Sequence, residues 1–218
     1  MKEGEFVRID YTGRIKSTGE VFDTTKEDVA RKGNIFNSKL RYSPIPVIIG
    51  AGFLIKGLEK ALREMEVGEK KIVIVKPEEG FGERREELVK LLPIALFERS
   101  NVKPIPGNYV TINNLKGKIV SVNGGRVKID FNHPLAGKEL EYEIEIREII
   151  TEPLEKAKAI VEQFIGFNNV KVRVSEKGVE IIMHRVNLGE LVRQRISDTI
   201  LKWIPEFEKV KFVNIYSR

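Results

Sequence analysis

The chain has 218 residues, with 38 Lys and Arg against 32 Asp and Glu, and therefore a formal net charge of +6 at pH 7. This excess is small for a chain in which 32% of residues are charged, and it does not by itself indicate nucleic-acid binding. The absence of cysteine excludes disulfides, thiolate nucleophiles and thiolate metal sites. Since the only histidines are His133 and His184, we expect neither a metal site nor a cofactor.

The sequence shows no sign of a secretory or membrane segment. Residues 1–11 lack the apolar core of a signal peptide. The most apolar stretch, 44–55, has 12 residues, whereas a membrane-spanning helix needs about 20. We therefore expect a cytoplasmic protein that does not contact a membrane.

The first part of the chain has the patterns of a sheet with one helix. Polar and apolar residues alternate through 5–16, which predicts a strand with Phe6 and Val7 on opposite faces. Further strands are predicted at 21–23, 44–49 and 70–76. Apolar residues recur at helical spacing through 53–65, which predicts a helix with one buried face.

The composition changes at residue 84. Short runs typical of strands follow at 88–92, 109–113, 118–122 and 126–130. A helical turn with proline at its first position is predicted at 93–98, and the Asn123-Gly124-Gly125 tripeptide predicts a hairpin. Strict alternation then returns in 139–150. Because a strand pattern resumes after this change in composition, we predict that 84–130 is an inserted domain.

The remainder of the chain reads as an αββαβ arrangement. Helices are predicted at 154–165 and 188–203, and strands at 170–175, 179–183 and 210–215. The fold class is therefore α+β, and we predict three domains: 1–83 together with 131–151, then 84–130, then 152–218. The C-terminal domain has a thin core for its size. This core and four large apolar residues predict a homodimer formed through that domain: Trp203, Phe207, Phe212 and Tyr216.

Several motifs resemble, in order and spacing, those of FKBP-type peptidyl-prolyl cis-trans isomerases. They are VFDT at 21–24, VIIG at 47–50, LIKGLE at 54–59 and MEVGE at 65–69. The segment FNHPLAGK at 131–138 resembles the SlyD-like branch, in which a small insert-in-flap chaperone domain interrupts the loop before the last strand. The C-terminal part resembles that of long archaeal FKBPs. The resemblance implies a curved antiparallel sheet packed on one short helix, and an isomerase that also acts as a chaperone.

The implied reaction needs no nucleophile. Rotation about an X–Pro bond has a barrier of roughly 18–20 kcal/mol because the amide is conjugated. Twisting removes the conjugation and makes the carbonyl less polar, so a water-free apolar pocket favours the twisted state. A positioned polar group can assist.

The resemblance also implies site residues. The catalytic pocket would consist of Tyr11, Phe22, Asp23, Ile55, Phe81 and Tyr142. Substrate contacts would come from Ile45, Leu54, Leu58 and Leu135, and in the inserted domain from Ile94, Phe97 and Tyr109.

The implied roles follow from position. Phe22 would face the proline ring, Asp23 would lie beside the carbonyl, and the N–H of Ile55 would bond a substrate carbonyl. Four residues depart from the family pattern. Ile45 stands where an aromatic residue is often found, and Leu58 stands where Trp is common. Phe81, in place of a usual Tyr, lacks a hydroxyl, and Tyr142 takes the place of a usual Phe.

Two other functions compete with this interpretation. A non-catalytic holdase that binds unfolded polypeptide is favoured by Leu58 and Phe81. Nucleic-acid binding would use the basic strands in 109–130, but no recognised motif is present, so we expect no nucleic-acid partner. The partners that we expect are unfolded or proline-containing polypeptides, gripped in part by exposed apolar residues of 84–130. That segment carries nine Lys and Arg against four Asp and Glu.

Overall fold

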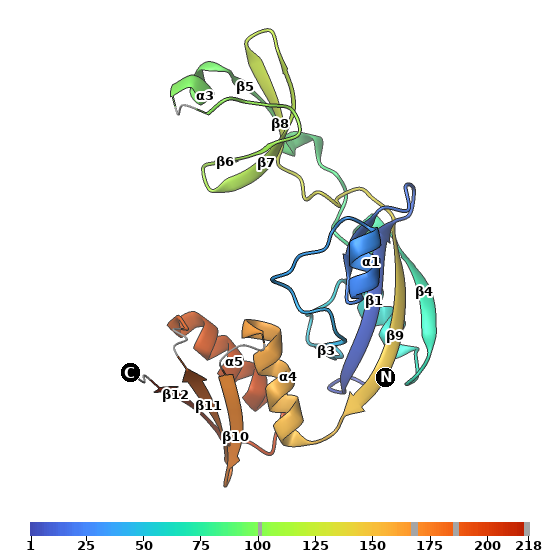
Figure 1. Ribbon diagram of the computed structural model, residues 1–218, viewed down its shortest axis with the longest axis vertical. Coiled ribbons are helices and arrows are strands. Elements are labelled where there is room, and N and C mark those ends of the chain that lie inside the picture. The colour runs from blue at the N-terminus through green and yellow to red at the C-terminus, as the bar shows by residue number, and fades with distance from the viewer. Residues whose placement is uncertain (100–101, 167–169, 185–187, 216–218) are drawn as a thin grey trace. The chain divides into compact units, whose positions relative to one another are not determined.

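The computed structural model describes residues 1–99, 102–166, 170–184 and 188–215 (Figure 1). It contains mainly antiparallel sheets and few helices, so the predicted α+β class is confirmed at that level. The chain forms two compact units, each with its own core. The first comprises Met1–Val75 and Leu140–Arg218, and the second Lys76–Glu139. The predicted division into three domains stays a prediction.

The first unit contains a five-stranded antiparallel sheet. Its strands are β1 (Phe6–Ile15), β2 (Val21–Thr24), β3 (Ile45–Ile48), β4 (Lys70–Val75) and β9 (Leu140–Ile150). β1 pairs with β2, β3 and β9, and β4 pairs with the other side of β9. The two segments with the strictest alternation thus form the longest pairing of the sheet.

The helices of this part are short: α1 (Glu27–Lys32) and α2 (Lys56–Arg63). The predicted helix at 53–65 was too long at both ends, because Ile55 has an extended backbone (φ −64°, ψ 150°) and is the N-cap, while Glu64 is the C-cap. In the turn before it, Gly50 and Gly52 have φ values of +85° and +75°, which favour glycine. Gly57 lets α2 approach the sheet, because a Cβ there would lie 2.8 Å from the side chain of Val75.

The C-terminal segment contains two helices and a three-stranded sheet. The elements are α4 (Pro153–Ile165), β10 (Val170–Ser175), β11 (Gly178–His184), α5 (Glu190–Trp203) and β12 (Lys209–Ile215). The strand order is β10-β11-β12. β10 and β11 are antiparallel, whereas β11 and β12 are parallel because α5 crosses between them.

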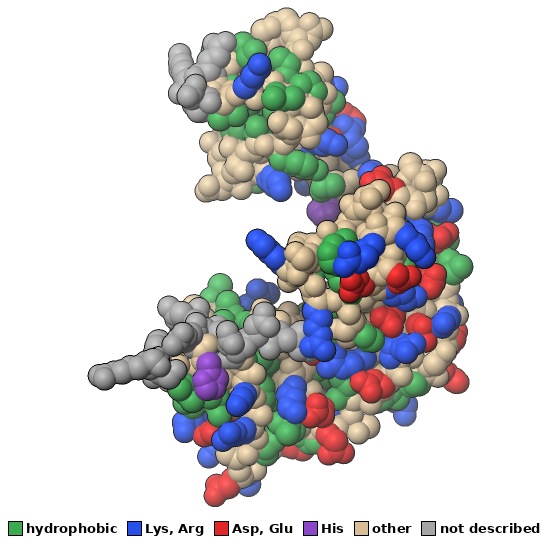
Figure 2. All heavy atoms as spheres, viewed as in Figure 1, with side chains coloured by type: hydrophobic (Ala, Val, Ile, Leu, Met, Phe, Trp, Pro, Cys, Tyr) green, Lys and Arg blue, Asp and Glu red, His purple; other side chains and the backbone are tan. Residues whose placement is uncertain are grey.

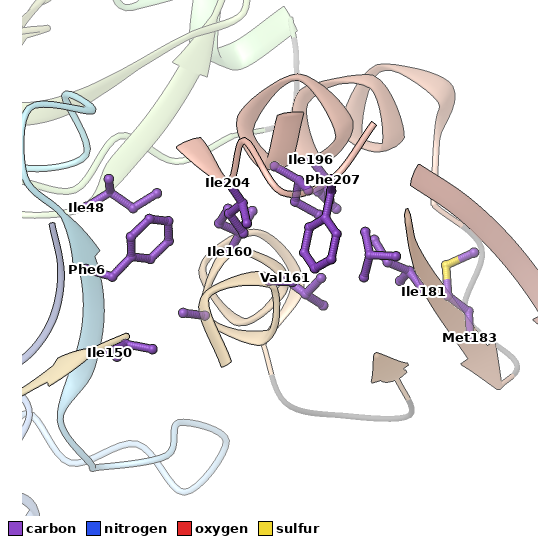
Figure 3. Close-up of a cluster of buried hydrophobic side chains, with 14 residues drawn as sticks. Phe6, Ile48, Ile150, Ile160, Val161, Ile181, Met183, Ile196, Ile204 and Phe207 are labelled. Carbon is purple, nitrogen blue, oxygen red and sulfur yellow. The ribbon is translucent and has the colours of Figure 1, made fainter. Parts of the chain in front are cut away.

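This segment shares a hydrophobic core with the five-stranded sheet. Phe6, Ile48 and Ile150, from β1, β3 and β9, lie against α4 (Figure 3). Phe6 and Val7 are both fully buried although they point to opposite faces of β1. The alternation in the sequence predicted that these two residues lie on opposite faces of β1. Contact with the C-terminal segment explains why Phe6 is buried.

Three of the residues on which the predicted homodimer depends point into this core. Phe207 is 5% exposed, and Trp203 and Phe212 pack against the cluster. Tyr216 lies outside the described residues. These aromatic residues therefore stabilise the C-terminal segment itself.

Arg8 forms the main polar contact between β1 and α4. Its guanidinium donates to both carboxylate oxygens of Glu162, at 3.0 and 2.8 Å, and to the carbonyl of Pro44 at 3.2 Å. The side chains of Arg8 and Glu162 are 24% and 9% exposed. The hydrogen bond and charge of Glu162 raise the pKa of Arg8, so the guanidinium stays charged. The bidentate geometry fixes the orientation of α4 on the sheet.

The second unit contains a four-stranded antiparallel sheet of order β5-β8-β7-β6. The strands are β5 (Val89–Pro93), β6 (Tyr109–Ile112), β7 (Leu115–Asn123) and β8 (Arg126–Asp130). The helical elements are η1 (Pro77–Glu79), η2 (Glu86–Leu88) and α3 (Ala95–Arg99). Phe97, Ile119, Val127 and Ile129 form its core.

The turn residues of this unit agree in part with the sequence. Gly124 and Gly125 have φ values of +55° and +71°, as a tight hairpin between β7 and β8 requires. Pro93 was wrongly placed at the start of a helix. It ends β5, paired with Arg126, and the helix begins at Ala95.

Among the described residues, no helix has the length and apolar character needed to cross a membrane.

Removing the charge of Glu162 tests the contact between α4 and the sheet. We expect Glu162→Gln to lower the free energy of unfolding by about 1–2 kcal/mol, because it removes the bidentate, mostly buried partner of Arg8 and leaves only the exposed carboxylate of Glu148, 3.3 Å from its Nε. Glu155→Gln on the same helix is the control, since Glu155 and Lys158 form an exposed pair worth at most about 0.5 kcal/mol. Urea denaturation measures both. Equal losses would contradict the special role of Glu162.

Candidate active site

A short hydrogen bond joins two of the predicted pocket residues, one on β1 and one on β2. The hydroxyl of Tyr11 donates to Oδ2 of Asp23 at 2.6 Å. Tyr11 is half-buried on β1, and Asp23 is exposed on β2. The pairing of Gly13 with Asp23 brings these two strands into register. This hydrogen bond holds the carboxylate of Asp23 beside the ring of Tyr11, with one carboxylate oxygen already accepting a hydrogen bond.

Three aromatic rings pack together at this place, and we call Tyr11, Phe22 and Tyr142 the aromatic cluster. The ring centroids of Tyr11 and Tyr142 are 6.2 Å apart, with an interplanar angle of 48°. Phe22 meets Tyr142 edge-on, at 5.6 Å and 83°. Both distances are typical of favourable aromatic pairs. The cluster thus combines residues that are more than 100 positions apart in the sequence.

Gly13 is a site residue that the sequence analysis missed. A Cβ at this position would lie 2.6 Å from the ring of Phe22 and 2.9 Å from that of Tyr142. Only glycine therefore allows both rings to lie over β1. The sequence signal was a glycine inside a strand pattern, which often marks the close approach of another group.

Two buried threonines fix the end of β2 on β1. The hydroxyls of Thr12 and Thr24 are 2.9 Å apart, and Thr24 also donates to the carbonyl of Tyr11 at 3.0 Å. The hydroxyl of Thr25 accepts from the N–H of Tyr11 at 3.0 Å and donates to Asp10 at 2.6 Å. This network, also missed in the sequence, holds the backbone that carries Asp23.

A β-bulge orients Phe22. Gly13 pairs with Asp23 and Arg14 with Val21, so Phe22 has no partner on β1. A bulge turns a side chain away from the direction that regular alternation would give it. Sequence alternation alone could not locate this irregularity.

The other predicted pocket residues of the first unit are placed on β3 and around α2. Ile45 begins β3 and pairs with Ile9. Leu54 and Ile55 are half-buried, and Ile55 caps α2, whereas Leu58 is 4% exposed on the helix. The ring contacts of the aromatic cluster do not include these residues, so their part in the pocket stays a prediction.

Phe81 and Leu135 belong to the second unit, where His133 links them. The rings of Phe81 and His133 are stacked at 4.3 Å and 2°. The N–H of Leu135 donates to Nδ1 of His133 at 3.2 Å. The role of Phe81 and Leu135 in the pocket stays a prediction.

The apolar residues predicted to contact substrate in the second unit have different surroundings. Tyr109 is 47% exposed, Phe97 is only 4% exposed and belongs to the core, and Ile94 packs against that core. Phe97 and Tyr109 line a hollow of about 480 Å³, together with Leu96, Val102, Val110, Thr111 and Ile112. Figure 2 shows hydrophobic side chains, in green, at the surface of this unit. Of the three residues predicted to contact substrate here, Tyr109 is therefore exposed and Phe97 is a core residue, and their part in substrate binding stays a prediction.

Comparison with known proteins relates this chain to isomerases. A short-type peptidyl-prolyl cis-trans isomerase of Methanocaldococcus jannaschii is 39% identical over 149 residues, which are 68% of this chain and 94% of that protein. The chain belongs to the FKBP-type peptidyl-prolyl cis-trans isomerase family. The enzyme class that the sequence motifs implied is thereby confirmed.

Three further similarities refine the position in the family. A probable FKBP-type 16 kDa isomerase of Pseudomonas fluorescens is 31% identical over 122 residues, covering 54% of this chain and 80% of that protein. The isomerase SlyD of Haemophilus influenzae is 35% identical over 106 residues, covering 47% and 56%. Residues 90–135 match a family model described as "FKBP26, IF domain". The resemblance to the SlyD-like branch is thus confirmed.

The electrostatics of the aromatic cluster keep both phenols of this FKBP family member neutral. Burial raises the pKa of Tyr11, and the negative charge and hydrogen bond of Asp23 raise it further. Burial and the charge of Asp23 also raise the pKa of Tyr142. Tyr11 therefore keeps the proton that it donates to Asp23, and Tyr142 keeps its hydroxyl proton as well. The described residues contain no group of three His, Asp or Glu side chains placed to bind a metal ion.

These pKa shifts predict how stability depends on pH. Unfolded tyrosine ionises near pH 10, whereas the folded chain keeps both phenols protonated to higher pH. The free energy of unfolding should therefore fall as the pH rises beyond about 10. Urea midpoints at pH 8 and pH 10.5 measure the fall. The variant with Tyr11→Phe and Tyr142→Phe should lose less stability over this interval, and an identical loss would contradict the assignment.

Proposed function

We propose that the aromatic cluster of this isomerase is where an X–Pro bond of a polypeptide is bound and twisted. The observation that carries the proposal is the Tyr11–Asp23 hydrogen bond beside the rings of Phe22 and Tyr142. In this arrangement three rings that are tilted to one another lie next to a fixed charge, and Tyr142 is only 4% exposed. A proline ring would pack against these rings, with the imide carbonyl beside Asp23.

The proposed mechanism is non-covalent. Packing of the proline ring on Phe22 and Tyr142 excludes water from the imide, and the twisted, less polar carbonyl loses less by this than the planar one. Asp23 supplies an oriented charge beside the carbonyl, and Tyr11 fixes the orientation of its carboxylate. The N–H of Ile55, at the start of α2, would bond a neighbouring substrate carbonyl. Leu58, Ile45 and Leu54 would complete the apolar wall.

Variants in the aromatic cluster and at the residues beside it test the mechanism. We expect Asp23→Asn and Tyr11→Phe each to lower kcat/KM for a short X–Pro peptide about tenfold, equivalent to about 1.4 kcal/mol of transition-state stabilisation. Gly13→Ala should lower it at least as much, because the new Cβ displaces Phe22 and Tyr142. A protease-coupled or NMR exchange assay measures the rates.

Tyr42→Phe is the matched control for these variants, because Tyr42 lies in the loop before β3 and its hydroxyl accepts from the N–H of Asn37. Its rate should equal that of the unchanged chain. Full activity of all three cluster variants would show that the pocket is elsewhere. A chain that accelerates no peptide but still prevents aggregation would be the non-catalytic holdase.

We also propose that the second unit holds unfolded polypeptide by its hollow. Leu96, Val102 and Tyr109 are between 44% and 47% exposed around the buried Phe97. Exposed apolar side chains that rim a concavity are suited to transient contact with unfolded chains. Transient binding there would raise the local concentration of X–Pro bonds for the isomerase.

Paired surface variants test this division of labour. Leu96→Ser with Tyr109→Ser should weaken suppression of aggregation and slow proline-limited refolding of a protein several-fold, while the rate on a short peptide stays unchanged. Leu91→Ser with Val120→Ser is the control, because both residues are exposed on the same unit but do not line the hollow. Equal effects of the two pairs would refute a role for the hollow.

The predicted homodimer stays a proposal. Support comes from α5, where Leu191 and Leu201 are 70% and 41% exposed. Sedimentation of the intact chain decides the point, and a monomer at all concentrations would refute it.

A further inference from the structure

The outer edge of β10 has no strand paired with it within the part of the chain that the structure describes. Among the described strands β10 pairs only with β11, and no described residue bonds the backbone groups on its other side (Figure 1). β10 has six residues, enough to pair with a segment of similar length. Unpaired edges of this kind are templates for an added strand.

A groove of about 500 Å³ runs along this edge, between β10 and α4, and we call it the β10 groove. Val161 of α4 and Val170 and Val172 of β10 give it an apolar side. Lys171 and Arg173 line it from β10 as well. Because side chains alternate along a strand, Val170 and Val172 lie on one face of β10, and Lys171 and Arg173 lie on the other.

The cations of β10 are the uncompensated charges of the groove. Its two carboxylates already have partners, since Glu162 binds Arg8 and Glu155 binds Lys158 at 2.7 Å. Lys171 and Arg173 form no ion pair within the described residues, and both are exposed. The groove therefore has an unmatched positive charge.

We propose that the β10 groove binds an extended polypeptide segment in which acidic and apolar residues alternate, added as a strand to β10. The acidic residues would face Lys171 and Arg173 as cross-strand pairs. The apolar residues between them would cover Val170 and Val172. This site shares no residue with the aromatic cluster, so it does not depend on the isomerase mechanism.

The charges argue against a second copy of this chain on the same edge. Antiparallel pairing of β10 with itself would bring the cations of one copy close to those of the other, and like charges across a strand pair are destabilising. An acidic segment removes this repulsion.

The test uses the full chain and an acetylated, amidated peptide of alternating valine and glutamate. Isothermal titration should detect binding that weakens with salt, and hydrogen exchange should show new protection of the β10 amides. A peptide with alternate residues N-methylated, which cannot donate along one edge, should bind at least tenfold more weakly. A peptide of alternating valine and lysine should not bind.

Charge reversal locates the site. Lys171→Glu with Arg173→Glu should weaken binding at least tenfold, with an unchanged rate on an X–Pro peptide as evidence of folding. Lys2→Glu with Lys60→Glu is the control, since both lysines are exposed and do not line the groove. Its affinity should stay within twofold of that of the unchanged chain.

Several results would overturn the proposal. They are absence of binding, protection confined to other strands, and equal affinity for the N-methylated peptide. Formation of a dimer that protects β10 without any peptide would assign the edge to a second copy of this chain instead.

Discussion

The central position of β1 is the constraint on which the remaining structure depends. β1 pairs with three strands, and each end of it serves a different purpose. Near its start, Phe6 and Arg8 hold the C-terminal segment by apolar contact and a bidentate ion pair. Near its end, Tyr11 and Gly13 support the aromatic cluster. Displacing this strand would disturb both regions at once.

The sequence predicted those elements whose signal is local. Alternation located β1 and β9, helical spacing located α2, α4 and α5, and paired glycines located the hairpin after Asn123. These patterns depend on neighbouring residues alone, so a single sequence contains them. The motif order also identified the family, which the comparisons confirmed.

The sequence could not predict features that depend on contacts between distant segments. The space required at Gly13 exists only because Tyr142, far along the chain, packs beside Phe22. Likewise, Glu162 looks like an ordinary helix-surface glutamate until α4 meets Arg8. The bulge at Phe22 has the same origin, since the pairing of β1 with β2 overrides simple alternation.

The proposed functions divide among three surfaces with different chemistry. The aromatic cluster is mostly apolar and has the charge of Asp23 beside it, which suits a proline ring and its carbonyl. The hollow of the second unit is apolar, which suits unfolded chain of varied sequence. The β10 groove combines a backbone edge and cations that have no partner among the described residues, which suits an extended acidic segment. Each proposed surface would contact polypeptide without requiring a covalent step.

The most direct measurement of the central claim is NMR of the intact chain with a short X–Pro peptide. The account predicts cis–trans exchange peaks of the peptide, together with shifts of the Tyr11, Gly13, Phe22 and Tyr142 signals that saturate at a common peptide concentration. Exchange of the peptide without any change at these four residues would contradict it, because catalysis would then take place elsewhere on the chain.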